Sequence, residues 1–265
     1  MRILITNDDG FEAPGISALY RAMSRFGVVS VVAPRQERSM CSHSIQLRKA
    51  MAVEAIEHAE MGRIWTVDAW PADCVRVALS CLLDFRPDWV VSGINGGANL
   101  GVDVFYSGTV AAAREAAING IPAIAFSQIF KPETKFNWPV SENWAAEVFS
   151  KLSSMPTQRP AIWNVTFPLT EGEESRMPEI QWAPLSLEPL PLTYQSNIGP
   201  HASPRAAWPS SGEARYTGDY FARPRTPGSD VEAVFSGKIA VTPIDLDSTA
   251  TEYVGPVRNE STTLR

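Results

Sequence analysis

Apolar segments alternate with amphipathic segments over the first 155 residues, and this alternation constrains the fold more than any other feature. Apolar strands are expected at 2–6, 28–32, 88–93 and 122–127, with shorter strands at 44–48, 51–56 and 63–67. Helices are expected at 14–23, 72–83, 109–119 and 141–152. Strands that are apolar on both faces and separated by helices predict a parallel sheet covered on each side. We therefore expect an α/β fold, a doubly wound, Rossmann-like three-layer α/β/α core with a mostly parallel sheet.

The chain changes character after residue 155. Ten prolines lie between Pro156 and Pro209, and proline breaks both regular helices and central strands. The same stretch holds three tryptophans, Trp163, Trp182 and Trp208, so it is unlike a low-complexity disordered segment. We expect residues 1–155 to form the α/β core and residues 156–265 to form an extension that belongs in part to the same structural domain. The extension is expected to carry an arm that packs on another subunit. Strands at 213–221 and 237–245 are expected to return to the core.

The overall composition narrows the class of partner and the compartment. The formal net charge of −6 argues against a nucleic-acid polymer or an anionic membrane surface as a partner, because both require clustered Lys and Arg. Three cysteines without a CxxC motif support neither a disulfide framework nor a zinc knuckle. No apolar run has the length of a membrane helix, and the first residues do not have the pattern of a signal peptide. The expected setting is the cytoplasm.

Polar side chains follow three of the expected strands at the point where each strand ends. Asp8 and Asp9 come directly after the first strand, and Ser39 lies in the loop that follows the second. Asn95 and Asn99 follow the strand that contains the DWVVSG segment. In open α/β sheets the carboxyl ends of the strands form the ligand-binding edge. We therefore expect these five side chains to converge at one edge of the sheet.

The donor atoms of this set favour a hard cation. Adjacent carboxylates such as Asp8 and Asp9 repel each other and are costly to bury, and a divalent cation would offset both effects. Carboxylate, hydroxyl and amide oxygens without histidine or thiolate suit Mg²⁺, Mn²⁺ or Ca²⁺ rather than zinc or copper. The alternative interpretation is that Asp8, Asp9 and Gly10 form an ordinary turn or helix cap. Convergence with the loops that carry Ser39 and Asn95 favours the cation.

A glycine-rich loop precedes the helix expected at 109–119. Five glycines lie in this loop: Gly93, Gly96, Gly97, Gly101 and Gly108. They allow the backbone to approach a ligand closely, and the amides at the start of a helix bind anions. Ser107 and Thr109 add hydroxyl groups, although either one can instead be a simple N-cap.

Two common phosphate-binding motifs are absent. The chain has no GxxxxGK[ST], and the loop after the first strand lacks GxGxxG, so neither a P-loop nor a dinucleotide site is expected. A cation beside an anion site predicts metal-assisted hydrolysis of a phosphate ester, with a metal-activated water as the nucleophile.

Several long motifs resemble, in order, those of the SurE family of survival-protein nucleotidases. They are NDDGFEAPGI (7–16), VVAP (31–34), ERS (37–39), PADCVRVAL (71–79), SGINGGANLGVDVFYSGTVAAAREA (92–116) and GSDVEAVFSGKIAVTPIDLD (228–247). The resemblance implies a metal-dependent phosphatase that converts nucleoside 5′- and 3′-monophosphates to nucleoside and phosphate. It also implies a Rossmann-like core and a homodimer or homotetramer with exchanged C-terminal elements.

The resemblance also implies roles for individual residues. The divalent metal ion, Mg²⁺ or Mn²⁺ and one per subunit, would be held by Asp8, Asp9, Ser39 and Asn95, with Asp8 and Asp9 as the catalytic carboxylates. The phosphate would be bound by Asn95, Gly96, Asn99, Ser107, Gly108 and Thr109.

The chain departs from the family pattern at one notable place, and two other functions stay open. The family usually reads DGTPxDCV where this chain reads DAWPADCV, so Ala69 and Trp70 replace Gly-Thr. The indole of Trp70 would narrow the pocket, stack on a base, or pack beneath the loop.

One alternative function is a phosphatase that forms an aspartyl-phosphate on Asp8, although such enzymes usually carry Asp-x-Asp. The other is a non-catalytic regulator that binds a nucleotide or a metal.

Overall fold

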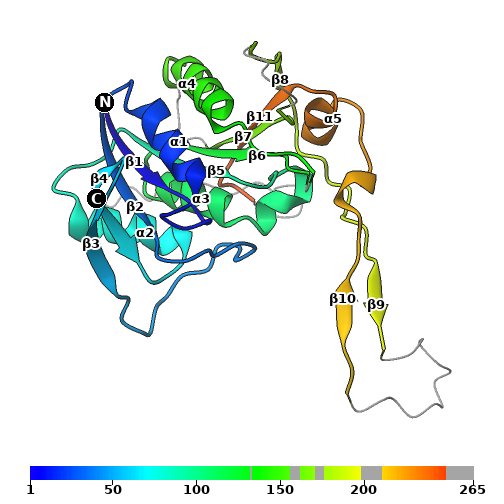
Figure 1. Cartoon of the computed structure of the whole chain (residues 1–265), viewed down its shortest axis with the longest axis horizontal. Helices are drawn as coiled ribbons and strands as arrows, with labels where there is room; N and C mark the ends of the chain where they lie inside the picture. The colour runs from blue at the N-terminus through cyan, green and yellow to red at the C-terminus, as the bar shows by residue number, and fades with distance from the viewer. Residues whose placement is uncertain (132, 156–161, 171–175, 198–210, 249–265) are drawn as a thin grey trace, which may run out of the picture.

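A single nine-stranded sheet forms the centre of the molecule, in the order β3-β4-β2-β1-β5-β6-β7-β11-β8 (Figure 1). The computed structural model describes residues 1–131, 133–155, 162–170, 176–197 and 211–248. Its strands are β1 (Arg2–Thr6), β2 (Val28–Pro34), β3 (Val53–His58), β4 (Gly62–Val67), β5 (Trp89–Asn95), β6 (Ala123–Gln128), β7 (Ile162–Phe167), β8 (Ile180–Trp182) and β11 (Ile239–Ile244). The pairs from β4 through β2, β1, β5 and β6 to β7 are all parallel, whereas β3 on β4 and β11 on β7 are antiparallel. The expected mostly parallel sheet is confirmed.

Helices cover both faces of this sheet. They are α1 (Pro14–Met23), α2 (Pro71–Val77), α3 (Gly108–Ile118), α4 (Trp138–Ser153) and α5 (Asp230–Phe235). Helices α1 and α4 pack together on one face, and α2 and α3 pack together on the other. The alternation of side chains along β1 shows the two layers, since Ile3 and Ile5 lie in the core with α1 and α4 while Leu4 lies in the core with α2 and α3. All three side chains are fully buried, as a central parallel strand requires. The three-layer α/β/α arrangement is therefore confirmed.

The structure corrects the expected strand at 44–48. These residues have no regular secondary structure and belong to a long loop between β2 and β3. In this loop the main-chain amide of Gln46 donates to both carboxylate oxygens of Asp73, at 3.0 and 3.1 Å, and not to a neighbouring strand. The helix expected at 72–83 is present, but its hydrogen-bonding pattern changes from α-helical to π-helical along its length. Its second half, Ala78–Leu82, is a π-helical turn.

The proline-rich half of the chain contributes more to the sheet than its composition suggests. Strand β7 is buried along its whole length, and β8 and β11 extend the sheet beyond it. The segment 237–245 returns to the sheet as β11, whereas 213–221 does not. Instead, β10 (Ala214–Tyr216) pairs with β9 (Tyr194–Ser196) in a separate two-stranded hairpin. Part of the expected arm, including Trp208, lies outside the described residues.

The hairpin projects away from the body of the molecule (Figure 1). A short 3₁₀ turn, Tyr220–Ala222, joins it to the body on the side of α5. None of the helices in the described part of the chain is both long and apolar enough to cross a membrane.

Candidate active site

The loops that follow β1, β2 and β5 meet the start of α3 at the carboxyl edge of the sheet, as expected. The amide of Arg38, in the loop after β2, donates to the main-chain oxygen of Asp8 at 2.7 Å. The amide of Gly96, after β5, donates to Asp9 Oδ2 at 3.1 Å. The hydroxyl of Thr109, in the first turn of α3, donates to Asp8 Oδ1 at 2.6 Å. Three segments far apart in the sequence therefore hold the two aspartates in place.

The two carboxylates have different environments. Asp8 is only 3% exposed, and burial followed by the charge of Asp9 raises the pKa of Asp8 to about 7, although the hydrogen bonds from Thr109 oppose this shift. Asp9 is partly exposed, and burial together with the charge of Glu37 raises its pKa above the ordinary value, against the opposing effect of the Gly96 amide. In the absence of a bound cation, the pair therefore resists carrying two negative charges near neutral pH. The cost anticipated from adjacent carboxylates is present in the structure.

Gly108 leaves the space in which this pair is packed. A Cβ atom at this position would lie 2.8 Å from Cys41 Sγ, 2.9 Å from Asp8 Cβ and 3.0 Å from Asp8 Oδ2. Real Cβ atoms do not approach other atoms this closely, so only glycine lets α3 begin against the side chain of Asp8. The sulfur of Cys41 also lies at this point, although no sequence pattern predicts that residue in the site. Burial raises the pKa of the Cys41 thiol to about 11, so the sulfur is protonated at neutral pH.

Asn95 and Ser39 reach the same edge in different ways. The side-chain amide nitrogen of Asn95 donates to Gly97 O at 2.5 Å. The side-chain oxygen of Asn95 is an acceptor and is therefore the atom that could bind a cation. Ser39 is exposed and donates to Glu37 Oε1 at 2.7 Å. It lies on the loop that Arg38 ties to Asp8.

These residues fit a hard divalent cation. The set consists of two carboxylates whose charges are uncompensated, an oriented amide oxygen from Asn95 and the hydroxyl of Ser39. Within the described residues, no three His, Cys, Asp or Glu side chains gather at one point. The oxygen donors of this set are of the kind that hard divalent cations prefer.

The expected phosphate-binding residues divide into open donors and engaged ones. Asn99 is 6% exposed, and its side-chain Nδ2 is buried without a hydrogen-bond partner among the described residues. A buried donor of this kind is unfavourable until it finds an acceptor, in water or in a ligand. Ser107 Oγ accepts from Val110 N at 3.0 Å, so it forms the N-cap of α3. Thr109 is fully buried and its hydroxyl is engaged with Asp8, which the sequence reasoning did not anticipate.

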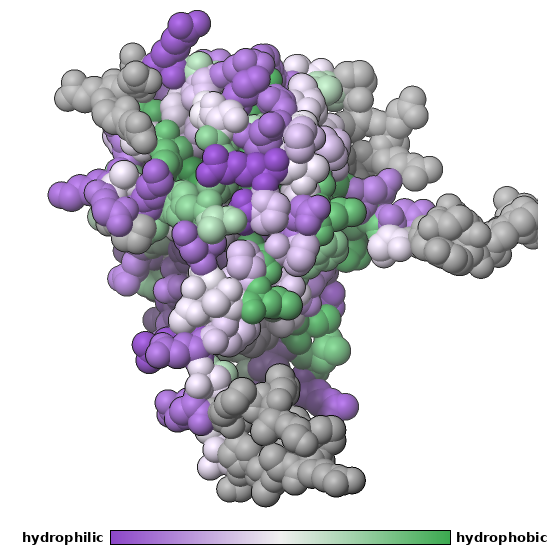
Figure 2. All heavy atoms as spheres, turned by 90° about the vertical axis from the view of Figure 1, so that its right-hand side faces the viewer, coloured by the Kyte–Doolittle hydropathy of each residue, from purple (hydrophilic) through white to green (hydrophobic). Residues whose placement is uncertain are grey.

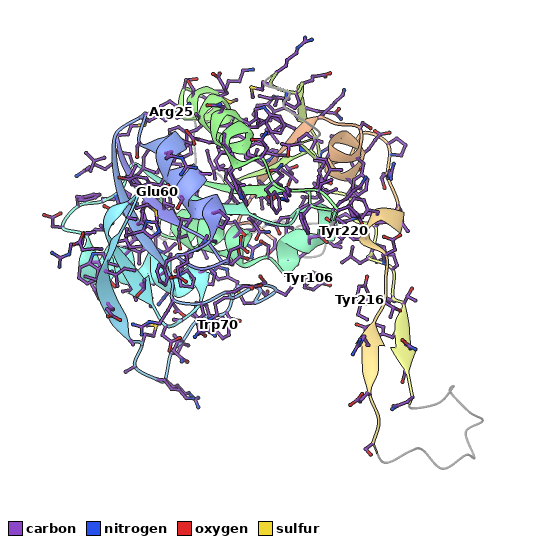
Figure 3. All side chains as sticks on the ribbon, viewed as in Figure 1. Arg25, Glu60, Trp70, Tyr106, Tyr216 and Tyr220 are labelled. Atoms are coloured by element: carbon purple, nitrogen blue, oxygen red, sulfur yellow. The ribbon has the colours of Figure 1, made fainter. Side chains whose placement is uncertain are left out.

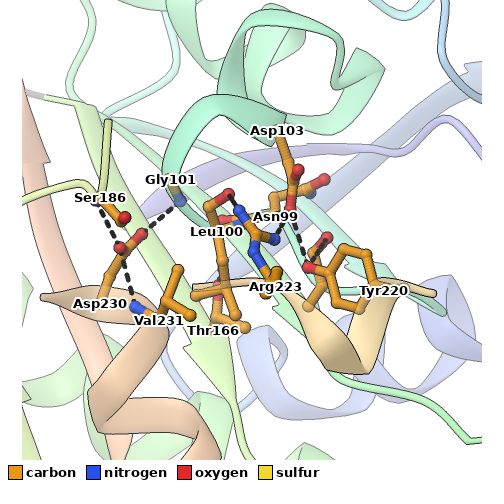
Figure 4. Close-up of polar contacts among 12 residues, drawn as sticks. Asn99, Leu100, Gly101, Asp103, Thr166, Ser186, Tyr220, Arg223, Asp230 and Val231 are labelled. Atoms are coloured by element: carbon orange, nitrogen blue, oxygen red, sulfur yellow. Dashed lines mark hydrogen bonds and ion pairs between the residues drawn. The ribbon is translucent and has the colours of Figure 1, made fainter. Parts of the chain in front are cut away.

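A polar cluster from the C-terminal half fixes the glycine-rich loop (Figure 4). Arg223 pairs with Asp103 at 2.7 Å and donates to Leu100 O at 3.0 Å, and the hydroxyl of Tyr220 donates to Asp103 at 2.7 Å. Asp230 accepts from the amide of Gly101 at 2.6 Å. The loop between Asn99 and Ser107 is thus held by residues more than a hundred positions away. The sequence reasoning missed this cluster, because charged residues that form internal pairs have no spacing that distinguishes them.

Trp70 contacts the loop after β2. The guanidinium of Arg38 lies over its indole, 5.1 Å from the ring centroid, and Arg38 also pairs with Asp68 at 2.7 Å. The same loop is bound further along by Tyr106, whose main-chain oxygen accepts from the Ser42 amide at 2.8 Å. Trp70 and Tyr106 are both labelled in Figure 3. Trp70 therefore contacts the segment that carries Ser39 through the side chain of Arg38.

Comparisons with known proteins agree with the motifs and the fold. The family model described as Survival protein SurE matches residues 3–189. A protein named 5'-nucleotidase SurE from Pelobacter propionicus is 39% identical, over 94% of this chain and 95% of its own. Another of that name, from Geotalea daltonii, is 37% identical over 94% of each chain. The crystal structure of the SurE protein from Aquifex aeolicus superposes with a TM-score of 0.79 at 31% identity, covering 94% of this chain and 95% of that one.

Proposed function

Because the chain belongs to the survival protein SurE family, we propose that it is a phosphatase that hydrolyses nucleoside monophosphates. Both 5′- and 3′-monophosphates are included in the proposal, and the products are a nucleoside and inorganic phosphate. The relatives named 5'-nucleotidase SurE, which match nearly the whole chain, support this substrate class. The single structural observation that supports it most is the pair of crowded carboxylates, Asp8 and Asp9, held by the loop after β2, the glycine-rich loop and the start of α3.

The residues of the site suit a phosphate ester bound next to a metal ion. We propose that Asp8, Asp9, Ser39 and Asn95 hold one Mg²⁺ or Mn²⁺ per subunit. Such an ion polarises a phosphoryl oxygen and lowers the pKa of a bound water. The main-chain amides of the glycine-rich loop and the start of α3 supply donors for the remaining phosphate oxygens.

The chain's own side chains have separable roles in this proposal. Thr109 holds Asp8 in one orientation through its 2.6 Å hydrogen bond, and Gly96 does the same for Asp9 through its amide. Asn99 Nδ2 donates to a phosphate oxygen and so gains the partner that it lacks among the described residues. Asp9 is the more accessible carboxylate, which makes it the better placed of the two to accept a proton from water.

The projecting hairpin supports an assembly of identical chains. We propose a homodimer or homotetramer in which the hairpin packs on a neighbouring subunit. Figure 2 views the side from which the hairpin projects, and apolar side chains are exposed among polar ones on this face. Leu187 and Leu192, in the segment that leads into β9, are 76% and 85% exposed. The acidic composition keeps a nucleic-acid polymer or a membrane from being an expected partner, and a cytoplasmic location remains a prediction.

A phosphate-release assay tests the function. Purified protein is incubated with adenosine 5′- and 3′-monophosphate after treatment with EDTA, and then again with Mg²⁺ or Mn²⁺ in excess. We expect no release in EDTA and release with one or both metals, and Asp9→Asn should lose both metal binding and activity while its circular dichroism stays native. Full activity in EDTA, or in Asp9→Asn, would contradict the assignment. Phosphate trapped covalently on Asp8 would instead support the aspartyl-phosphate alternative, and nucleotide binding without turnover under every condition would support the regulator.

A further inference from the structure

Three aromatic rings form a row beside the candidate site. The rings of Phe130 and Phe136 lie 4.9 Å apart with an interplanar angle of 19°, and those of Phe136 and Trp138 lie 4.6 Å apart at 24°. Both pairs are stacked, which differs from the tilted and edge-on pairs found in the core of this molecule. The three residues follow β6, so they reach the same carboxyl edge of the sheet as the aspartates.

The row is anchored at one end and open at the other. At the inner end, Trp138 begins α4 and packs against the core, and its Cη2 atom lies 3.2 Å from where a Cβ on Gly15 would stand. At the outer end, Phe130 is 39% exposed. One face of the Phe130 ring is covered by Phe136, and the partly exposed Phe130 side chain lines a cavity. A stacked aromatic face binds a planar ring with little sequence or substituent preference, because every nucleobase has a π-face.

A cavity connects this open ring with the candidate active site. It has a volume of about 780 Å³, which lies within the range of small-molecule sites. Its lining includes Phe130 but not Phe136, so the outer ring alone reaches the cavity. Gly96 lines the same cavity, and its amide is the one that donates to Asp9 Oδ2. A Cβ built on Gly96 would lie 3.5 Å from the Phe136 ring and 4.0 Å from Asp9 Oδ2, so only a glycine separates the aromatic row from the carboxylate.

Residues from the base of the hairpin also line the cavity. They are Gly218–Phe221, and the hydroxyl of Tyr220 among them is bound to Asp103. Lys131 lies over the ring of Phe221, 5.4 Å from its centroid. Asp219 and Glu133 also line the cavity and supply acceptors for the hydroxyl or amino groups of a bound molecule. The cavity thus offers an aromatic side chain, polar groups and, at Gly96, a residue whose amide contacts Asp9.

We propose that Phe130 is the platform on which the base of a nucleoside monophosphate stacks, with the ribose lying in the cavity between this ring and Gly96. This assignment rests on the proposed function, because it places the phosphate beside Asp9. It predicts that the aromatic row determines the preference for nucleotides over phosphate esters that lack a base. The row acts on substrate binding and leaves the chemistry at the phosphate unchanged.

A pair of matched substrates tests the platform. Adenosine 5′-monophosphate and ribose 5-phosphate differ only in the base, so their KM and kcat values are compared in Phe130→Ala, Phe130→Tyr and Trp182→Ala. Trp182 is an exposed tryptophan on β8 at the far edge of the sheet and serves as the control for loss of an aromatic side chain. In Phe130→Ala we expect the KM for the nucleotide to rise by about tenfold or more, with little change for ribose 5-phosphate. Phe130→Tyr should restore the nucleotide KM, and Trp182→Ala should change neither substrate.

The outcomes separate this proposal from the proposed function. Equal changes for both substrates, or no change for the nucleotide, would overturn the platform while leaving the phosphatase intact. If the wild-type protein hydrolyses neither ester with any metal, the proposed function fails. Calorimetric binding of the same two compounds then decides the platform, because Phe130→Ala should weaken binding of the nucleotide alone. Nucleotide binding that is unchanged by Phe130→Ala would refute the platform in that case too.

Discussion

Replacing Asp8 by asparagine should make the metal-free protein less sensitive to pH. Burial and the charge of Asp9 raise the pKa of Asp8 from 3.8 to about 7 in the folded chain. Between these two pKa values, the folded state keeps a proton on Asp8 that the unfolded state releases. Protonated Asp8 therefore contributes fully to the free energy of unfolding below pH 3.8, and this contribution is lost as the pH rises through about 7. Across the interval from near pH 5 to near pH 8, the linkage relation gives a loss of about 3 kcal/mol. Asp8→Asn has no proton to lose and should not show this part of the decline.

Urea unfolding followed by tryptophan fluorescence measures the effect. Wild type and Asp8→Asn are compared in EDTA near pH 5 and near pH 8, and the difference between the two proteins cancels the titration of groups distant from Asp8. A saturating metal supplies the second comparison. At a concentration of 100 times its Kd, Mn²⁺ should stabilise the wild type by about 2.7 kcal/mol near pH 8, because it binds only the folded state. It should stabilise Asp8→Asn far less.

Two results would refute this reasoning. An equal loss of stability in both proteins between the two pH values would show that Asp8 is ionised in the metal-free fold at low pH as well. Equal stabilisation of both proteins by Mn²⁺ would show that the ion binds elsewhere.

The remaining predictions concern packing and charge around the site. Gly108→Ala should lower kcat/KM on the order of 100-fold in the phosphate-release assay, because the new Cβ would lie 2.9 Å from Asp8 Cβ and displace the carboxylate. Arg223→Met should cost about 3–5 kcal/mol in urea unfolding, because it leaves Asp103 buried without its ion pair. For Glu115, burial raises the pKa, but hydrogen bonds from a histidine and an arginine outweigh it and lower the pKa below the ordinary 4.5. Its stabilising contribution is present above pH 4.5 and lost at lower pH, so thermal melts of Glu115→Gln should show a smaller decline on acidification than those of the wild type.

The sequence predicted the parts of the molecule that follow from local pattern. Apolar strands such as Arg2–Thr6 must be buried on both faces, and this requirement leads to the parallel sheet and then to the edge where Asp8 and Asp9 lie. The same logic brought the loops of Ser39 and Asn95 to that edge. The expected strand at 44–48 was wrong. The main-chain amide of Gln46 in this segment donates to the side chain of Asp73, and a sequence pattern cannot reveal such a contact.

Long-range contacts account for what sequence reasoning could not supply. Thr109 was expected to face a phosphate, but its partner in the structure is Asp8. Strand β7 was hidden within the proline-rich half, because six buried residues flanked by irregular chain have too little length to show a period. The aromatic segment after β6 does carry a signal, since three rings in nine residues follow a strand end at the ligand-binding edge. That signal becomes interpretable only when Phe130 and Phe136 are seen to stack.

The C-terminal half is therefore part of the site and not an appendage to it. Arg223 and Tyr220 leave the base of the hairpin and bind Asp103, which lies between Asn99 and Gly108 on the glycine-rich loop. Arg223 is 3% exposed, so its charge is compensated within the protein and its position is coupled to that of the loop. The same turn lines the cavity that Phe130 also lines. If the proposed packing of the hairpin on a neighbouring subunit takes place, the contacts of Arg223 and Tyr220 with Asp103 would connect that interface to the glycine-rich loop.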